Sequence, residues 1–239
     1  MHSASLGISP DGARLFAAAY NSATLYYRDI TLGISGSVTI PGYSSSNGVL
    51  IRMAIASDGT GYLSSGTQYW TFTTVDTPVV SGPYTLTSSA STVDTTGNGD
   101  LIAASNGDVY LIKSPTTASN YIDVFKISGT SGTTAQYYGR VTDSDLNQAF
   151  GGAAALSTGL YVSSTSGRLS NVNLATYSAS TVTSNAAITA DLASCYYPNL
   201  APNITATKSV SKVAGSAGTS VLPGDTLEYT IVTRNSGTL

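Results

Sequence analysis

The chain has 239 residues, enough for one large or two modest domains, and its formal net charge is −3. Only 10% of the residues are charged, and no run of Lys and Arg offers the electrostatic footprint that nucleic-acid binding requires. No apolar run approaches the ~20 residues that span a bilayer, and the single Cys195 cannot form an intrachain disulfide. The N-terminal sequence lacks the pattern of a signal peptide, so we expect any signal or anchor to lie outside these residues.

The polar surface must come mostly from uncharged side chains. The sequence contains 36 Ser and 33 Thr, against 12 Asp, one Glu and four Lys. Thr, Tyr, Val and Ile suit the half-buried surface of a strand, whereas the helix formers Glu and Lys are scarce. With 24 Gly available for turns, the composition predicts an all-β protein with many short strands. This Ser/Thr/Tyr-rich surface is also typical of exported microbial surface proteins.

Four segments along the chain share one plan, in which a glycine turn and a short apolar strand are followed by a polar turn and a second strand. Their marker glycines are Gly12, Gly59, Gly99 and Gly159, spaced by 47, 40 and 60 residues. With the strand-like pieces between them, each unit holds about four strands in ~40–50 residues, the size of a propeller blade. The sequence therefore predicts a β-propeller-like domain, with a plain β-sandwich of irregular hairpins as the alternative.

The clearest hairpin signal is "AASNGDVYL". Here Asn106-Gly107 fits a two-residue type I′ turn that would pair residues 101–104 with 109–112. The longest spacing between marker glycines leaves room for an insertion near residues 142–152.

The segments "SPDGARLFAA" and "ASDGTGYLSS" resemble a strand of the six- or seven-bladed propellers found in bacterial and archaeal cell-surface proteins. The segment "TADLASCYYP", residues 189–198, resembles one that closes such a propeller before a following surface-protein repeat. The resemblance covers residues 1–200 loosely. It implies a β-propeller-like domain of about four recognisable blades, incomplete beside six or seven, and it implies no ligand.

The composition changes after "YYPNLAPN", where Pro198 and Pro202 predict a domain boundary. Beyond it, "ITATKSVSK" and "TLEYTIVTRNSG" are predicted as strands, and "LPGD" as a tight turn. Residues 207–211 and 223–237 resemble the opening of an immunoglobulin-like repeat of unknown function that recurs in bacterial cell-surface proteins. Since such a sandwich needs about seven strands, we expect residues 203–239 to be its truncated N-terminal strands, poorly ordered or docked on the propeller.

The usual catalytic residues are nearly absent from the sequence. His2 is the only His, which argues against a Ser-His-Asp triad and against a His-based zinc site. No common nucleophile, zinc-protease or phosphate-binding motif occurs. Asp11 and Asp58, in "PDG" and "SDG", are interpreted as turn residues rather than catalytic carboxylates. We therefore expect no catalytic, cofactor-binding or metal-binding residues, and a protein that is not an enzyme.

Two alternatives to this interpretation involve a metal ion or a sugar. Asp143, Asp145 and Asn147 alternate as at the start of a calcium loop, but Gln148 and Ala154 break the EF-hand pattern, so a solvated turn is preferred. Residues 94–100 are a similar case. An aromatic sugar-binding face is the other alternative, although packing between blades is the preferred role for the residues concerned: Tyr26, Tyr27, Tyr69, Trp70 and Tyr110.

The C-terminal segment contains the residue types of the isopeptide bond that some surface immunoglobulin-like domains form. These are Lys208, Asn235 and, as the carboxyl catalyst, Glu228. Without the rest of such a domain the pattern has little specificity.

Together these observations predict a noncatalytic, secreted or cell-surface module, a structural or adhesive scaffold of a larger multidomain surface protein. Its partners would be the other domains of that protein, with glycans or another surface protein as further candidates and no nucleic acid. A carbohydrate-binding or carbohydrate-active propeller is the alternative function, and it would need carboxylates or aromatic rings converging on one rim.

Overall fold

The computed structural model describes residues 3–85, 98–115, 118–127, 135–156, 159–164, 166–184, 192, 197, 204–213 and 220–235. Within these residues the regular elements are strands, apart from two single-turn 3-10 helices, η1 (Ser45–Asn47) and η2 (Ser144–Leu146). The prediction of an all-β protein is confirmed. None of the helices in the described part of the chain is long and apolar enough to cross a membrane.

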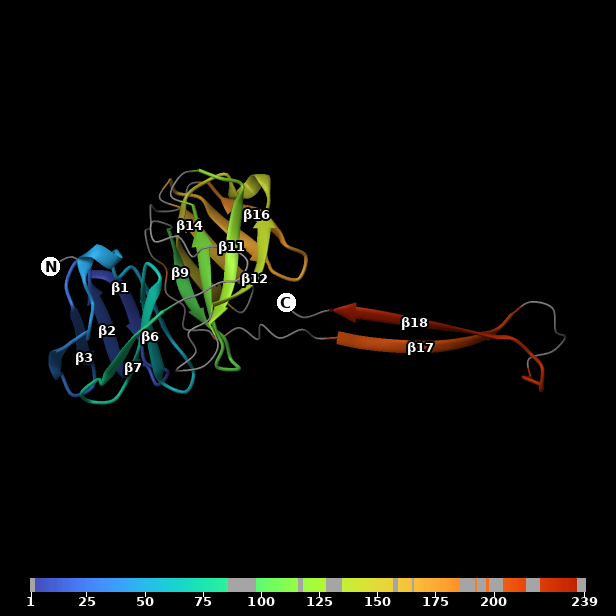
Figure 1. The fold of residues 1–239 in the computed structure, drawn as a ribbon, viewed down its shortest axis with the longest axis horizontal. Helices are drawn as coiled ribbons and strands as arrows, with labels where there is room; N and C mark the ends of the chain where they lie inside the picture. The colour runs from blue at the N-terminus through green and yellow to red at the C-terminus, as the bar shows by residue number, and fades with distance from the viewer. Residues whose placement is uncertain are drawn as a thin grey trace.

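Sixteen of the described strands form four sheets of four strands each, which we call blades 1 to 4 (Figure 1). Blade 1 contains β1 (Ser3–Ile8), β2 (Arg14–Ala19), β3 (Thr24–Asp29) and β4 (Ser35–Thr39). Blade 2 contains β5 (Arg52–Ile55), β6 (Thr60–Ser65), β7 (Gln68–Thr73) and β8 (Val80–Thr85). Blade 3 contains β9 (Asn98–Ala103), β10 (Val109–Ser114), β11 (Tyr121–Ile127) and β12 (Ala135–Thr142). Blade 4 contains β13 (Phe150–Leu156), β14 (Gly159–Ser164), β15 (Leu169–Asn173) and β16 (Ser178–Thr183).

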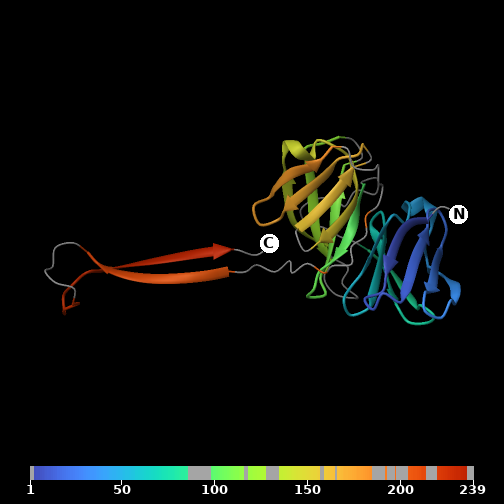
Figure 2. The same cartoon turned by 180° about the vertical axis from the view of Figure 1, so that it is seen from behind.

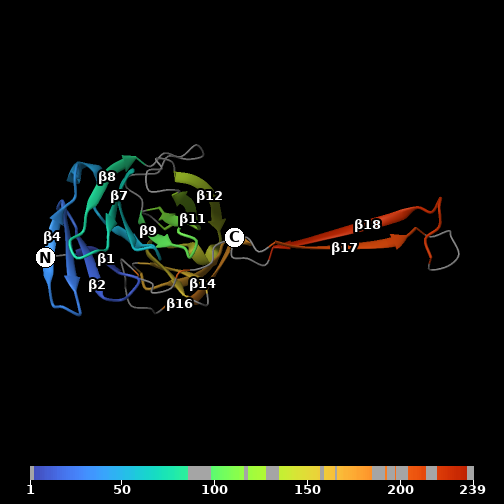
Figure 3. The ribbon, with the colours of Figure 1, turned by 90° about the horizontal axis from the view of Figure 1, so that it is seen from below.

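Each blade is an antiparallel meander in which consecutive strands pair with each other. The first strands of successive blades also pack side by side, β1 with β5, β5 with β9 and β9 with β13. This is the arrangement of a β-propeller, in which the first strand of each blade lies nearest the axis. The plain β-sandwich alternative is therefore wrong for blades 1 to 4. In Figure 3 the four blades follow one another across the body of the molecule from blue to orange.

The described core consists of three apolar clusters, one at each junction between blades. Between blades 1 and 2, Phe16 and Leu25 face Trp70 and Phe72, and all four side chains are buried. The Trp70 ring also anchors the connection between the blades, because its Nε1 donates a hydrogen bond of 2.8 Å to the carbonyl of Pro41. Burying apolar area between sheets is what holds successive blades together.

The repeat has a different marker in blade 3 from the one that the sequence predicted. The first hairpins of blades 1, 2 and 3 turn at Gly12, Gly59 and Gly107, each with a positive φ and an N–H that donates to the carbonyl three residues earlier. Gly99 instead lies inside β9. With Gly159 opening β14, the corrected spacings are 47, 48 and 52 residues.

The predicted type I′ turn at Asn106-Gly107 is also wrong. A type I′ turn needs positive φ at both central residues, but Tyr177 is the only described non-glycine residue with a positive φ. The hairpin closes between the N–H of Ala104 and the carbonyl of Asp108 (2.8 Å), which leaves three residues in the turn and the left-handed conformation at Gly107 alone. The predicted pairing survives, since Val109 pairs with Ala103 and Leu111 with Leu101.

The strand pieces predicted between the hairpins correspond to β4, β8, β11, β12 and β16. No large insertion occupies residues 142–152, where η2 and the start of β13 connect blades 3 and 4.

A two-stranded sheet follows the blades, formed by β17 (Ile204–Lys212) and β18 (Leu227–Asn235). Its nine residue pairs run without a register shift, from Ile204 with Asn235 to Lys212 with Leu227. The predicted "LPGD" turn is present, with the N–H of Asp225 donating to the carbonyl of Leu222 and Gly224 at φ +97°. This hairpin projects away from the blades in all three views (Figures 1–3) and packs against none of the described blade strands.

Among the described residues, nothing forms the second sheet that an immunoglobulin-like sandwich would require. The predicted boundary at Pro198 and Pro202 lies outside the described residues, as do His2 and Cys195.

Candidate functional site

The four first strands enclose an apolar groove beside the axis of the blades. When these strands are aligned on their turn glycines, Leu6, Met53, Leu101 and Ala153 occupy one register position. These four residues line the groove together with Ile8, Ile55 and Ile102. The groove encloses a volume of about 130 Å³. It exists because each first strand turns a small or aliphatic side chain toward the axis at the same height.

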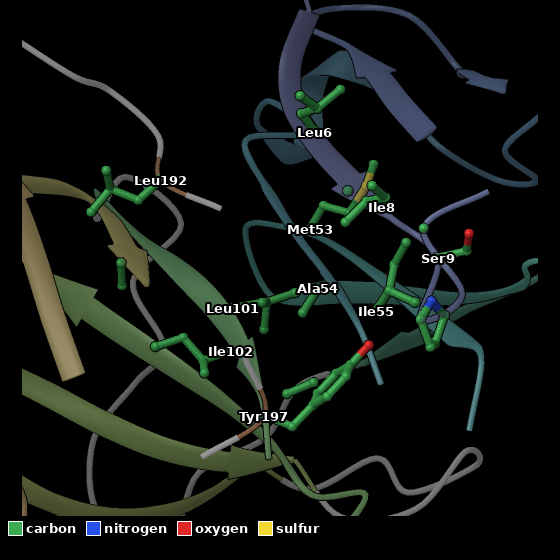
Figure 4. A pocket seen from close by; sticks show the side chains of 15 residues that line it. Leu6, Ile8, Ser9, Met53, Ala54, Ile55, Leu101, Ile102, Leu192 and Tyr197 are labelled. Atoms are coloured by element: carbon green, nitrogen blue, oxygen red, sulfur yellow. The ribbon is translucent and has the colours of Figure 1, made fainter. Parts of the chain in front are cut away.

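Two residues that follow the blades in sequence also line this groove. Leu192 and Tyr197 approach it, and the Tyr197 ring packs against the buried cluster between blades 2 and 3. Figure 4 shows Leu6, Ile8 and Met53 on one side and Leu101 and Ile102 on the other, with the Tyr197 ring below both groups in this view. Residues far apart in the sequence thus meet at the axis.

The chemistry of the groove is that of a nonpolar surface. Among the described residues, its lining contains no carboxylate, imidazole, amine or guanidinium, and Ser9 and Tyr197 supply side-chain hydroxyls. Ser9 is already used by the turn, since its Oγ donates to Asp11 Oδ1 and accepts the N–H of Arg14 at 2.8 Å. The groove suits an apolar ligand, and the described part of its lining offers no positioned general acid or base.

Buried polar side chains lie at the end of the first strands that is remote from the turns. Ser5, Arg52 and Asp100 each lie seven residues before the turn glycine of their blade. Each side chain is no more than 2% exposed. Asp100 joins two blades, because Oδ1 accepts the N–H of Leu101 (2.8 Å) and Oδ2 accepts the N–H of Ala153 on β13 (3.0 Å). A buried carboxylate that accepts backbone N–H groups across a blade junction has a structural role.

The turn aspartates behave as the sequence predicted. Asp11 Oδ1 accepts the N–H of Ala13 at 3.0 Å, and Asp58 Oδ1 accepts the N–H of Thr60 at 2.8 Å. Asn106 makes the same bond to the N–H of Asp108 in blade 3. Each side chain mimics a backbone turn acceptor, which confirms the structural interpretation of Asp11 and Asp58.

Asp143 and Asp145, which the sequence offered as calcium ligands, instead bind the backbone of an edge strand. The carboxylate of Asp143 accepts the N–H groups of Asp145 (3.0 Å) and Ala179 (3.1 Å), while Asp145 accepts the N–H of Thr181 (2.8 Å). Ala179 and Thr181 belong to β16, the outermost strand of blade 4, whose unpaired N–H groups would otherwise need another partner. The hydrogen bonds from Asp145 and Ala179 hold the pKa of Asp143 below its ordinary value.

Asn147 contributes its backbone to this corner, where its N–H donates to the carbonyl of Ser144. Across the described residues, no three His, Cys, Asp or Glu side chains converge as a metal site would require. Most of the similar segment 94–100 lies outside the described residues.

The aromatic residues considered for a sugar-binding face mostly pack in the core, as the preferred interpretation predicted. Tyr69, Trp70 and Tyr110 are no more than 1% exposed, and Tyr27 packs against the cluster between blades 1 and 2. Burial raises the pKa of Tyr69 to about 12 and also raises that of Tyr110. Tyr26 is half-buried like Tyr27 but points to the opposite face of blade 1, outside that cluster.

The arrangement of the hairpin argues against the isopeptide interpretation. Lys208 pairs with Ile231 and Glu228 with Ser211, so their side chains alternate onto opposite faces of the sheet. The Lys208 ammonium lies 4.4 Å from the centroid of the Tyr229 ring, in a cation–π contact. The side chain of Asn235 is outside the described part of the structure.

One polar cluster escaped the sequence analysis. In blade 3, the Arg140 guanidinium forms two hydrogen bonds with Asp123 (2.8 and 2.9 Å) and lies 3.8 Å from the Tyr121 ring centroid. The hydrogen bond to Asp123 raises the pKa of Arg140. Only the β11–β12 pairing, which places Asp123 opposite Arg140, could have revealed this contact.

No family model and no curated protein matches this sequence. Solved structures with a similar fold include the β-propeller domain of Cps50 (Swd1) from Myceliophteria thermophila, at 11% identity and a TM-score of 0.48, covering 80% of this chain and 76% of that one. A putative 6-phosphogluconolactonase from Bacteroides fragilis matches at 17% identity and a TM-score of 0.48. The match covers 80% of this chain and 56% of that one. A functionally unknown protein from Desulfotomaculum acetoxidans matches at 14% identity and a TM-score of 0.44. The match covers 79% of this chain and 73% of that one. These similarities concern the fold and carry no information on function.

Proposed function

We propose that this chain is a noncatalytic module of a secreted or cell-surface protein, in which four blades form a scaffold and the β17–β18 hairpin begins an immunoglobulin-like repeat. The observation that carries the proposal is the axial groove, where the lining residues that the structure describes offer no carboxylate, imidazole or amine for acid–base chemistry. The pairing of the Asp143 and Asp145 carboxylates with backbone N–H groups supports the same conclusion at the other candidate site.

The surface location draws support from composition and from the hairpin. A Ser- and Thr-rich, Lys-poor chain covers itself with uncharged polar groups, and the hairpin carries the residues that resemble an immunoglobulin-like surface repeat. The partners in this proposal are further domains of the same surface protein, with a glycan or a second surface protein as a possible adhesive target.

The test of location is protease shaving of intact cells that produce the protein, followed by detection with an antibody raised against residues 1–239. We expect the antibody to label unpermeabilised cells, and the label to disappear after shaving while a cytoplasmic marker survives. Label found only after permeabilisation would contradict the proposal.

The test of the noncatalytic role is a screen of the purified chain against fluorogenic glycosides and lactones, with Tyr197→Phe as the matched variant. We expect turnover no faster than in buffer for both proteins. Turnover that the loss of the Tyr197 hydroxyl abolishes would overturn the proposal and favour the carbohydrate-active alternative.

A further inference from the structure

A polar hollow lies where blade 3 meets the connection to blade 4, at the end of blade 3 that is remote from its first hairpin turn. It is formed by the β10–β11 connection, the start of β11 and the region of η2, and it encloses about 490 Å³. Its lining is uncharged: Ala118, Ser119, Asn120, Tyr121, Ser144 and Asn147. None of these six residues lines the axial groove, so the hollow is a separate candidate site.

The β10–β11 connection is longer than its equivalents in the other blades. It spans residues 115–120, which are six residues. The second and third strands of blades 1, 2 and 4 are joined by residues 20–23, 66–67 and 165–168, which are four, two and four residues. Repeat proteins commonly place binding residues on connections that are longer than the repeat requires. Residues 118–120 of this longer connection form one wall of the hollow.

The walls of the hollow are held together by backbone contacts. Ser119 forms isolated β-bridges with Asn147 and Gln148, and the carbonyl of Asn120 accepts the N–H of Asp143 at 2.8 Å. These contacts fix the β10–β11 connection against the region of η2. A site whose shape exists before its ligand arrives loses less conformational entropy on binding.

Tyr121 gives the hollow an aromatic wall of fixed orientation. The Arg140 guanidinium lies 3.8 Å from the centroid of this ring and is itself held by two hydrogen bonds to Asp123. Tyr121 remains half-buried and lines the hollow. An aromatic side chain that is already immobilised offers contact area at little cost in entropy. Because Asp123 neutralises Arg140, this stacking does not turn the hollow into an anion site.

Two exposed carboxamides of the lining are free for a ligand. The side chains of Asn120 and Asn147 make no hydrogen bond within the part of the chain that the structure describes. In the connection between blades 1 and 2, by contrast, Asn47 of η1 donates its Nδ2 to Gln68 Oε1 at 2.6 Å. Each free carboxamide offers two donor hydrogens and one acceptor oxygen.

This combination of groups matches the chemistry of a neutral sugar. Carboxamides pair with hydroxyls that both donate and accept, and an aromatic ring contacts the C–H surface of a pyranose through its apolar body. No charged side chain is among the described lining residues, which disfavours a phosphate or carboxylate ligand. The predominance of hydroxyl and amide groups disfavours an apolar ligand. A volume of about 490 Å³ has room for one sugar residue.

We propose that this hollow binds one residue of a neutral glycan, with Asn120 and Asn147 hydrogen-bonded to its hydroxyls and Tyr121 in contact with its ring. The inference deepens the proposed function, because it makes a glycan the adhesive target, and it rests on that function for the place where the glycan is met. A single open subsite binds weakly, so we expect a Kd on the order of 1 mM.

The experiment is a titration of the isotope-labelled full chain with glucose, galactose, mannose and N-acetylglucosamine, each up to about 100 mM, well above the expected Kd. Amide proton–nitrogen correlation spectra detect the side-chain carboxamides directly, and the loss of a signal in Asn120→Ala or Asn147→Ala assigns it. We expect at least one sugar to shift both signals along a saturating curve. Sodium sulfate, titrated in parallel, should leave them unshifted.

Substitutions then test the three residues singly. We expect Asn120→Ala, Asn147→Ala and Tyr121→Leu each to raise the Kd about tenfold, as measured on the backbone signals that move in the wild type. The matched control is Asn21→Ala, at an exposed Asn in the shorter β2–β3 connection of blade 1, which should leave the Kd unchanged. Thermal unfolding checks the fold of each variant, and the two Asn variants, at exposed positions, decide the outcome if Tyr121→Leu is unfolded.

Three results would overturn the proposal. They are the absence of any sugar-induced shift of the Asn120 and Asn147 signals, a shift by sulfate as large as that by any sugar, and an unchanged Kd in both Asn variants. Each of these results leaves the surface location standing, since protease shaving measures it separately. Label found only inside permeabilised cells would overturn the surface location and leave the sugar site standing.

Discussion

Single polar side chains join neighbouring blades at points where an apolar residue could not. Asp100 is 1% exposed, and both of its carboxylate oxygens accept backbone N–H groups, one of them from the next blade. In a buried site such a group must keep all its partners, because each unsatisfied donor costs free energy that water no longer repays.

We expect Asp100→Asn to lower the free energy of unfolding by about 1–3 kcal/mol, because the amide nitrogen would face a backbone donor in place of an acceptor oxygen. Urea denaturation of the full chain measures this change. Asp76→Asn, at a side chain 85% exposed, is the control and should change stability little. Equal effects at the two positions would contradict the role assigned to Asp100.

Asp143 should make stability depend on acid pH. Its pKa is lowered by hydrogen bonds from Asp145 and Ala179 in the folded state, so its contribution is present above the unfolded pKa of ~3.9 and is lost as pH falls through the folded value. We expect the difference in unfolding free energy between wild type and Asp143→Asn to be largest at neutral pH and to shrink below pH ~4. A difference that stays constant from neutral pH to pH ~3 would argue against this assignment.

For single side chains, the sequence predicted a structural role only where the hydrogen-bond partner is close along the chain. The turns at Asp11 and Asp58 were predictable because each carboxylate bonds an N–H two residues away. The role of Asp143 was not, because its partner Ala179 is 36 residues distant and is placed only by the docking of blade 4.

Among the elements, the first hairpins of blades 1 to 3 each turn at a single glycine with positive φ. Gly107 has φ +84° and open space where a Cβ would stand, so Ala there meets backbone strain alone. Gly99 has φ +136°, and a Cβ on it would lie 1.9 Å from the carbonyl oxygen of Ile112 in the neighbouring strand.

We expect Gly107→Ala to cost about 1 kcal/mol of unfolding free energy, and Gly99→Ala to cost several times as much, because the backbone of β9 or β10 must move. Chemical denaturation of the two variants side by side measures the ratio. A Gly99→Ala protein as stable as Gly107→Ala would show that β9 and β10 are not paired as described.

These two glycines also show where the sequence interpretation failed. Gly99 and Gly107 both follow Asn in short polar stretches, and local chemistry does not separate a turn from a strand interior. The pairing of β9 with β10 decides between them, since a one-residue change in register turns every side chain to the other face. The strand pattern of β18 could be recognised because Leu227, Tyr229 and Ile231 alternate with polar residues along the first half of the strand.

For the whole molecule, the number of strands per unit and the approximate repeat length could be predicted, since apolar segments and glycine turns recur along the chain. The axial groove could not be predicted, because it is formed by four strands and by Tyr197, and their positions around the axis depend on how the blades pack.

The hairpin should contribute little to the stability of the blades. Neither of its strands packs against a described blade strand, so we expect a chain ending before residue 204 to unfold within 1–2 °C of the full chain at low concentration, by the scale that relates free energy to melting temperature. Differential scanning calorimetry measures this. A drop of about 5 °C or more would mean that the hairpin stabilises the blades.

The first strands pack mainly in chain order, β1 with β5, β5 with β9 and β9 with β13, so the body is close to a one-dimensional stack of blades. Its folding free energy is then approximately a sum of the stability of each blade and of the interfaces between neighbouring blades, as in solenoid proteins. The three buried clusters form these interfaces. Blades 2 and 3 each have two such interfaces, whereas blades 1 and 4 have one within the described residues. Loss of an inner blade would therefore divide the cooperative unit, while loss of a terminal blade would only shorten it.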